Sequence, residues 1–260
     1  MKTTLGCVRK ADQDFCMIAP GDRIAVGVSG GKDSLLLLIA LHLYRLFRHT
    51  DYTLHAFTMT MGLAPFELSG VKELCASLGI PHTVKETDIG HILFDLRGEK
   101  NPCTLCSRMR RGILNGLARE YDCNKLALAH HRDDALETLM MSLLFEGRIH
   151  TFHPVTYLSD IGLTVIRPLS YLPEKHIRHV AKALSLPVVK NPCPANGHTR
   201  RQEMKELLAA LARRYPKAPE LMLNALKNQA QYGLWWRPGV SAPGTPAKGA
   251  QPLWNPNREE

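Results

Sequence analysis

Six consecutive residues, Ser29 to Ser34, bring two glycines, a lysine, a carboxylate and two hydroxyls together in the order Ser-Gly-Gly-Lys-Asp-Ser. The apolar run Ile24 to Val28 before them predicts a buried strand, and the apolar run Leu35 to Leu38 after them predicts the start of a helix. A strand, a glycine turn and a helix N-terminus surround an anion with backbone N–H groups, and glycines let the backbone approach it closely. We therefore predict a phosphate-binding loop, the alternative being an ordinary glycine turn.

This loop differs from a Walker A loop, which has a glycine six residues before its lysine and a serine or threonine directly after it; here these positions hold Val26 and Asp33. A dinucleotide-binding G-x-G-x-x-G motif would have a glycine at Ser29. The order Ser-Gly-Gly-Lys-Asp-Ser instead resembles the PP-loop of the ATP pyrophosphatase superfamily. This resemblance implies that the loop holds the pyrophosphate of ATP while AMP is formed. The expected ATP contacts are Ser29, Gly30, Gly31, Lys32, Asp33 and Ser34, with Lys32 and Asp33 also acting in catalysis.

Two cysteines with two residues between them, Cys103 and Cys106, are spaced to hold one metal ion or one corner of a cluster. Such a pair is also compatible with a redox dithiol. Cys193 supplies a third thiol, and His198 could complete a zinc site of three cysteines and one histidine. Three thiolates without a fourth ligand would leave one iron of a cubane cluster open to an exogenous ligand. The residue types alone support zinc and an iron–sulfur cluster equally.

Arginines flank both cysteine segments. Arg108, Arg110 and Arg111 share the expected helix of the cysteine pair, and Arg200 and Arg201 follow the third cysteine. Guanidinium groups can neutralise the phosphates of a folded RNA, and the net charge of +9 agrees with a polyanionic partner. We expect these five arginines to contact RNA, the alternative being solvated helix faces.

Two consecutive carboxylates, Asp133 and Asp134, follow the apolar strand expected at 125–129. Carboxylates at a strand end can hold Mg²⁺ against ATP phosphates or act as a base. We expect both as Mg²⁺ ligands and Asp134 also as a catalytic residue. The alternative for Asp133 is to cap the N-terminus of the helix that follows.

Three further side chains are expected at the ATP site. His130 and His131 precede the two carboxylates, and Thr58 lies near the tip of a strand expected at 52–60. The carboxyl ends of parallel strands share one edge of a sheet, where ligands bind. We therefore expect Thr58, His130 and His131 to contact adenosine or substrate, a structural hydrogen bond being the alternative for each histidine.

The elements that position these residues alternate between apolar strands and amphipathic helices. This alternation predicts an α/β fold with a doubly wound, mainly parallel sheet and additional helices at the C-terminus. A last strand is expected at 187–190. The predicted divisions are an N-terminal lead-in at 1–20, an ATPase domain with the cysteine-pair helix at 21–190, a helical part with the third cysteine at 191–232, and a flexible tail rich in proline, glycine and tryptophan at 233–260.

Composition and patterning argue against several classes of protein. Residues 1–20 contain charges and no apolar core, so no secretory signal is expected. The aliphatic run Leu35 to Leu41 is too short to span a membrane. Seven cysteines among 260 residues are too few for a disulfide scaffold. We therefore expect a soluble, cytoplasmic protein with reduced thiols and no membrane partner.

The motifs together resemble those of the TtcA family of tRNA 2-thiocytidine synthetases. The resemblance covers about residues 15–230 and rests on the PP-loop and on the runs Cys103 to Gly112, His130 to Thr138 and Ile166 to Leu169. It implies an ATP- and Mg²⁺-dependent tRNA thiolase with the PP-loop fold, which resembles that of adenine nucleotide alpha-hydrolases. The implied ligands of its 4Fe–4S cluster are Cys103, Cys106 and Cys193.

The same resemblance implies a reaction. The C2 carbonyl of a tRNA pyrimidine, expected to be cytidine, is adenylylated, and its oxygen is replaced by sulfur delivered at the cluster. Expected partners are tRNA and a sulfur donor, either a cysteine desulfurase or free sulfide, and a homodimer is an open expectation. The alternatives are the same scaffold acting on another nucleoside, forming thiouridine or removing sulfur, and a cluster-containing RNA-binding redox regulator.

Overall fold

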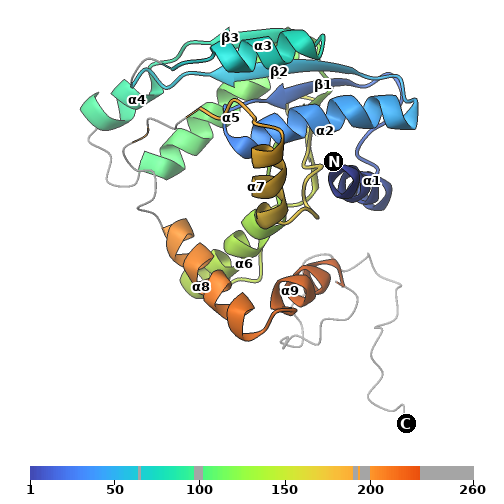
Figure 1. Cartoon of the computed structure of the whole chain (residues 1–260). Coiled ribbons are helices and arrows are strands. Elements are labelled where there is room, and N and C mark those ends of the chain that lie inside the picture. The colour runs from blue at the N-terminus through green and yellow to red at the C-terminus, as the bar shows by residue number, and fades with distance from the viewer. Residues whose placement is uncertain (64–65, 97–101, 190–192, 194–199, 229–260) are drawn as a thin grey trace, which may run out of the picture. The chain divides into compact units, whose positions relative to one another are not determined.

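The computed structural model describes residues 1–63, 66–96, 102–189, 193 and 200–228 (Figure 1). The chain divides into two units, Met1–Leu223 and Asn224–Glu260, and the fold described below belongs to the first. The predicted tail at 233–260 lies outside the described residues. Within the described ranges, no helix has the length and apolar character needed to cross a membrane.

A six-stranded sheet forms the centre of the first unit, with the strand order β3-β2-β1-β4-β6-β5. The pairs β3–β2, β2–β1, β1–β4 and β4–β6 are parallel, and β5 is antiparallel to β6 at one edge. The predicted doubly wound, mainly parallel sheet is therefore confirmed. The strands are β1 Arg23–Gly27, β2 Thr53–Met59, β3 His82–Lys85, β4 Lys125–Ala127, β5 Val155–Leu158 and β6 Leu163–Ile166.

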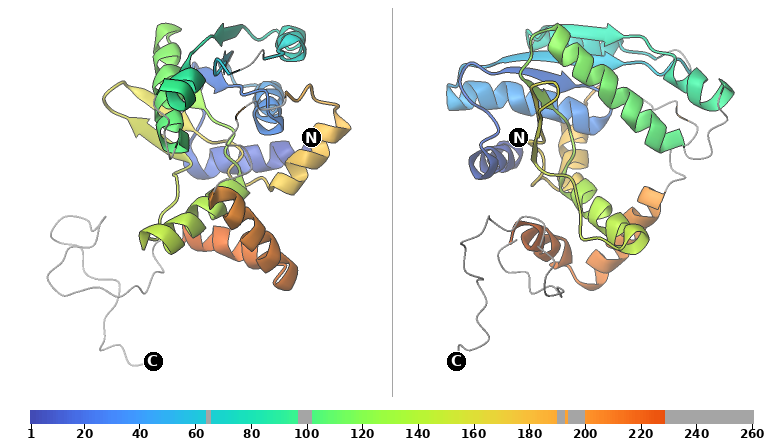
Figure 2. Two further views of the ribbon diagram at one scale, coloured as in Figure 1. Left: turned by 90° about the vertical axis from the view of Figure 1, so that its left-hand side faces the viewer. Right: turned by 180° about the vertical axis from the view of Figure 1, so that it is seen from behind.

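Helices cover both faces of this sheet (Figures 1 and 2). The side chains of Ile24 and Val26 enter a core with α1, α2, α3 and α7, whereas that of Ala25 enters a second core with α5. This alternation follows from the two-residue period of a strand. The helices are α1 Lys2–Phe15, α2 Lys32–Arg48, α3 Ser69–Ser77, α4 Ile89–His91, the π-helix η1 Ile92–Leu96, α5 Pro102–Glu120, α6 Arg132–Glu146, α7 Glu174–Ala183, α8 Arg200–Arg214 and α9 Ala218–Lys227.

The structure places two segments at the ends of the expected ATPase domain. The lead-in at 1–20 contains α1, which packs into the core through Val8 and Ala11 and is anchored where Asp12 accepts a hydrogen bond from the Tyr44 hydroxyl (2.7 Å). Burial of this helix against α2 makes it part of the domain. The strand expected at 187–190 is wrong for its described residues, 187–189, because Val189 N–H donates to the PP-loop carbonyl of Gly30 (2.9 Å) instead of to a strand.

Candidate active site

The PP-loop connects β1 to α2 and is closed by its own serines. Ser29 N–H donates to Ser34 Oγ (3.1 Å), and the Ser34 hydroxyl donates to Gly31 O (2.9 Å). Gly30 has φ +76°, and a Cβ there would lie 3.0 Å from Val189 Cβ, so both the backbone and the neighbour require glycine. The predicted strand–loop–helix is thus present, and internal hydrogen bonds hold its loop.

Lys32 is the cationic group of the loop and lies between two carboxylates. Its Nζ is 3.0 Å from Asp33 Oδ2 and 3.0 Å from Glu174 Oε1. Burial alone would lower the pKa of Lys32, but Asp33 and Glu174 outweigh it and raise the pKa above its usual value. The lysine therefore stays cationic where a pyrophosphate would need it.

Glu174 was not identified from the sequence. It is the first residue of α7, is only 7% exposed, and also pairs with Lys205 of α8 at 2.8 Å. Its backbone N–H donates to Asp133 Oδ2 (2.8 Å), which fixes the start of the helix. An acidic residue directly after proline, in the first turn of a helix, was the available sequence signal.

His131 and Asp134 form a capping box at the start of α6. His131 N–H donates to Asp134 Oδ2 (2.9 Å), and Asp134 N–H donates to His131 Nδ1 (3.3 Å). Because Nδ1 accepts, a neutral His131 carries its proton on Nε2, which lies 3.8 Å from Asp33 Oδ1. His131 therefore makes the structural hydrogen bond that was the alternative to a ligand contact. The His131 ring also faces Asp33 of the PP-loop.

The two carboxylates predicted to hold Mg²⁺ are both engaged by protein groups. Asp133 accepts from the Glu174 N–H and from Arg132 Nη2 (3.2 Å), so it caps α7. Asp134 Oδ1 accepts from Arg201 Nη1 (3.3 Å). In contrast, Asp33 Oδ1 is buried and has no hydrogen-bond partner among the described residues. The role of Asp133 and Asp134 as Mg²⁺ ligands stays a prediction. Among the described residues, Asp33 has a carboxylate oxygen without a hydrogen-bond partner.

His130 and Thr58 are both committed to internal contacts. Burial lowers the pKa of His130 to about 4, so its ring is neutral, and its Nδ1 accepts from Arg167 Nε (3.3 Å). The Thr58 hydroxyl is fully buried, donates to Val28 O (2.8 Å) and contacts His82 Nε2 (2.9 Å). Contacts of Thr58 and His130 with ATP stay predictions.

The three predicted cluster ligands lie in one region. Burial raises the pKa of the Cys106 thiol, Arg110 opposes this rise, and the charges of Cys193 and Cys103 add to it. The charges of the Cys103 and Cys193 thiolates therefore act on the Cys106 thiol. Among the residues that the structure describes, no three potential ligands stand at metal-binding distance. His198, the fourth ligand of the zinc alternative, lies outside the described residues.

The predicted RNA-binding arginines divide into two groups. Arg200 lies over the Phe145 ring (4.6 Å to its centroid), and Arg201 pairs with Asp134 and Glu137. These two residues dock α8 on α6. Arg108, Arg110 and Arg111 lie on α5, after the start of the helix that carries the cysteine pair. RNA contacts of all five stay predictions.

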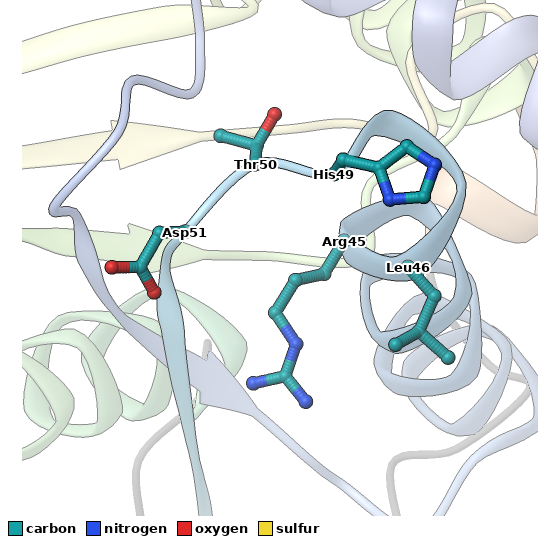
Figure 3. Close-up of a pocket in the computed structure, with 5 residues that line it drawn as sticks. All are labelled: Arg45, Leu46, His49, Thr50 and Asp51. Carbon is teal, nitrogen blue, oxygen red and sulfur yellow. The ribbon is translucent and has the colours of Figure 1, made fainter.

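A separate surface depression of about 410 Å³ lies at the end of α2, away from the PP-loop (Figure 3). Arg45, Leu46, His49, Thr50 and Asp51 line it. It adjoins the amino end of β2, whereas ligands of parallel sheets bind at the carboxyl ends. We assign it no part in the reaction.

A family model described as a PP-loop domain matches residues 7–211. A tRNA-cytidine(32) 2-sulfurtransferase from Pelobacter propionicus is 42% identical over 225 residues, covering 85% of this chain and 83% of the relative. The chain belongs to this family of PP-loop tRNA-cytidine(32) 2-sulfurtransferases. The enzyme of that name from Geotalea uraniireducens is 40% identical, with 85% and 89% coverage.

A solved structure resembles the fold of this PP-loop sulfurtransferase. It is the U34-tRNA thiolase NcsA from Methanococcus maripaludis with its [4Fe-4S] cluster, at a TM-score of 0.72 and 26% identity. The match covers 87% of this chain and 77% of NcsA. The resemblance to the TtcA family that the motifs indicated is therefore confirmed.

Proposed function

We propose that this chain is an ATP-dependent tRNA sulfurtransferase that converts a tRNA cytidine to 2-thiocytidine. The observation that carries the proposal is the formed PP-loop at the end of β1 in a chain of the sulfurtransferase family, and the nearness of Cys106 to Cys103 and Cys193 supports it. ATP activation and sulfur delivery thereby have candidate groups in one domain. The names of the curated relatives support cytidine, at tRNA position 32, as the target.

ATP activation overcomes the poor leaving ability of a carbonyl oxygen. The C2 oxygen of the base attacks the α-phosphorus, pyrophosphate leaves, and sulfide then displaces AMP from C2. Lys32 stays cationic between Asp33 and Glu174 and offsets the charge of the departing pyrophosphate. The N–H groups of the PP-loop orient the phosphates, as at other helix N-termini.

The donor set fits an iron–sulfur cluster with three protein ligands. Cys103, Cys106 and Cys193 form no disulfide within the described part of the chain, and Arg110 favours the thiolate form of Cys106. When bound, a 4Fe–4S cluster supplies an iron with an open position that holds sulfide deprotonated. Cys103 and Cys106 on α5 lie in one region with Cys193, which precedes α8, and this accords with binding of such a group by all three thiols.

Mg²⁺ is the second expected cofactor. Asp33 Oδ1 is a buried carboxylate oxygen without a hydrogen-bond partner in the described part of the chain, with His131 Nε2 3.8 Å away, which suits a hard cation next to phosphates. Asp133 and Asp134 would first have to release the groups that they now bind. We therefore propose Asp33 as the primary protein ligand of Mg²⁺.

Nucleoside mass spectrometry tests the proposed function. The cluster-reconstituted protein, kept anaerobic, is incubated with ATP, Mg²⁺, sulfide and an unmodified tRNA transcript. We expect 2-thiocytidine from the parent and from Cys16→Ala, whose exposed cysteine ends α1, and none from Cys103→Ala. Full thiolation by Cys103→Ala, or thiouridine as the product, would contradict the proposal.

The same assay addresses the sulfur donor and the regulator alternative. Turnover with sulfide alone would identify free sulfide as a sufficient sulfur donor. Turnover only with an added cysteine desulfurase would identify the desulfurase as the donor. A regulator that merely binds ATP would release no pyrophosphate when tRNA is added. Analytical ultracentrifugation of the reconstituted protein tests the expected homodimer.

A further inference from the structure

Arg167 directly follows β6, and its described partners are all neutral. Its Nη1 donates to His153 O (2.6 Å) and Thr156 Oγ1 (3.3 Å), and its Nε donates to His130 Nδ1. The guanidinium carbon also lies 5.1 Å from the centre of the Phe152 ring. These contacts hold the side chain in place without compensating its charge.

The neighbouring charge that acts on Arg167 is that of a second arginine, Arg111. The helix α5, which carries Arg111, packs against β6, and burial together with the charge of Arg111 lowers the pKa of Arg167 to about 10. No ion pair of either arginine with a carboxylate is found within the described ranges. A partly buried guanidinium such as that of Arg167, next to a second positive charge, is unfavourable unless an anion joins the two.

Other cations of this domain are treated differently. Lys32 and Lys205 share Glu174, and Arg201 contacts two carboxylates. Lys125 lies 2.6 Å from Asp22 Oδ2. Each of these four cations has at least one carboxylate partner, whereas Arg111 and Arg167 have none among the described residues.

The position of the pair indicates which anion it would receive. Arg111 follows Cys106 by five residues on α5, or about 7.5 Å along the helix axis. Arg167 directly follows β6, and β4 separates β6 from the PP-loop strand β1, which is about 10 Å at the usual strand spacing. Lys32 and the loop N–H groups are the expected contacts of the ATP phosphates, which favours a different phosphate as the anion near the cysteine helix.

We propose that Arg111 and Arg167 together bind one backbone phosphate of the RNA strand that carries the target base. Two guanidinium forks match the oxygens of a phosphodiester, and the contact would hold the base between the PP-loop and the cysteines. This proposal rests on the proposed function in taking RNA as the ligand. It adds Arg167, which the sequence motifs did not assign to RNA, as a binding residue.

Binding of an unmodified tRNA transcript, measured by fluorescence anisotropy over a KCl series, tests the pair. We expect Arg167→Gln and Arg111→Gln each to weaken binding roughly tenfold or more. Each should also reduce the slope of log K against log salt by about 0.7–0.9, the value for one phosphate. The double variant should be scarcely weaker than either single one, because both remove the same contact.

Arg45→Gln serves as the matched control, because Arg45 lines the depression at the end of α2, away from the PP-loop (Figure 3). We expect it to bind tRNA as the parent does. Binding of ATP should be unchanged in Arg167→Gln, and Arg167→Lys should recover the salt slope but only part of the affinity. Arg111 is exposed, so Arg111→Gln carries the test if Arg167→Gln does not fold.

Two outcomes would overturn the pair as an RNA site. One is parental tRNA affinity and slope in both glutamine variants. The other is a loss of ATP affinity with tRNA affinity unchanged, which would assign the anion to the nucleotide. A parent protein that binds tRNA through this pair but does not thiolate it would instead refute the proposed function alone.

Discussion

Glu174 Oε1 lies 3.0 Å from Lys32 Nζ, so the first residue of α7 holds the lysine of the PP-loop. The same carboxylate contacts Lys205 of α8. Its backbone is fixed by Asp133, and its side chain is almost fully buried. Glu174 is therefore a positioning residue that joins the ATP-binding loop to the helix following the third cysteine.

Replacing Glu174 by glutamine tests this positioning role. The amide keeps the size of the side chain but leaves two lysines with one carboxylate fewer, so Lys32 loses part of its orientation. We expect KM for ATP to rise roughly tenfold, equivalent to about 1.4 kcal/mol, with a smaller change in KM for tRNA. Steady-state pyrophosphate release measures both constants.

Two further variants separate positioning from general damage. Glu174→Asp retains the charge and should recover part of the ATP affinity, whereas Glu203→Gln alters an exposed carboxylate of α8 and should change neither constant. Equal increases in both KM values would argue against a specific effect on the PP-loop.

The Glu174 ion pairs also predict acid sensitivity. Burial alone would raise the pKa of Glu174, but Lys205 and Lys32 lower it from 4.5 to about 2. Between these values the unfolded chain binds more protons than the folded chain, so stability is present above about pH 4.5 and is lost as pH falls. We expect Glu174→Gln to remove about 1–3 kcal/mol of this pH dependence. Urea unfolding at several pH values measures it, and a parent–variant difference that is independent of pH would contradict it.

The left-handed backbone at Gly30 gives a prediction for the loop. Gly30→Ala combines the unfavourable φ of +76° with a 3.0 Å approach to Val189 Cβ, whereas Gly21→Ala has a similar φ of +81° and no atom within 4 Å. The left-handed conformation costs roughly 1–2 kcal/mol in each variant. We expect only Gly30→Ala to show a further loss of stability and of ATP binding, measured by urea unfolding and calorimetry. Equal losses in the two variants would exclude crowding at the loop.

The contacts of Arg201 lead to a prediction about cluster retention. Burial raises the pKa of Glu137 to about 7, and Arg201 opposes this rise from 3.4 Å. Arg201→Gln should therefore destabilise the α6–α8 contact by about 1 kcal/mol, because solvent screens the pairs of a 44% exposed arginine. Because α8 follows the segment with Cys193, we also expect less iron per chain after anaerobic reconstitution. Unfolding experiments and iron analysis measure the two effects.

Arg213→Gln is the matched control for this prediction, because Arg213 is an exposed residue of the last turn of the same helix. It should keep both the stability and the iron content of the parent. Parental stability of Arg201→Gln combined with weakened tRNA binding would instead favour the RNA contact that the sequence predicted.

The amino-acid sequence by itself determined the parts that are contiguous in the chain. The run from Ile24 to Leu38 specifies strand, loop and helix through local apolar pattern and glycine, and the structure has them there. The alternation of strands and helices likewise determined the mainly parallel sheet. Local backbone preferences and side-chain periodicity are sufficient for such features. The family motifs, which are also local, led to the sulfurtransferase assignment.

Only the tertiary structure decided how distant side chains share their partners. Glu174 contacts Lys32, Arg201 pairs with Asp134, and the charge of Arg111 acts on Arg167, which has no carboxylate partner among the described residues. No local pattern encodes these choices, because each arises where separate elements pack and leave a charge compensated or uncompensated. The sequence thus supplied the chemical groups, and the packing of α5, α7 and α8 around the sheet determined which of them remain available to a ligand.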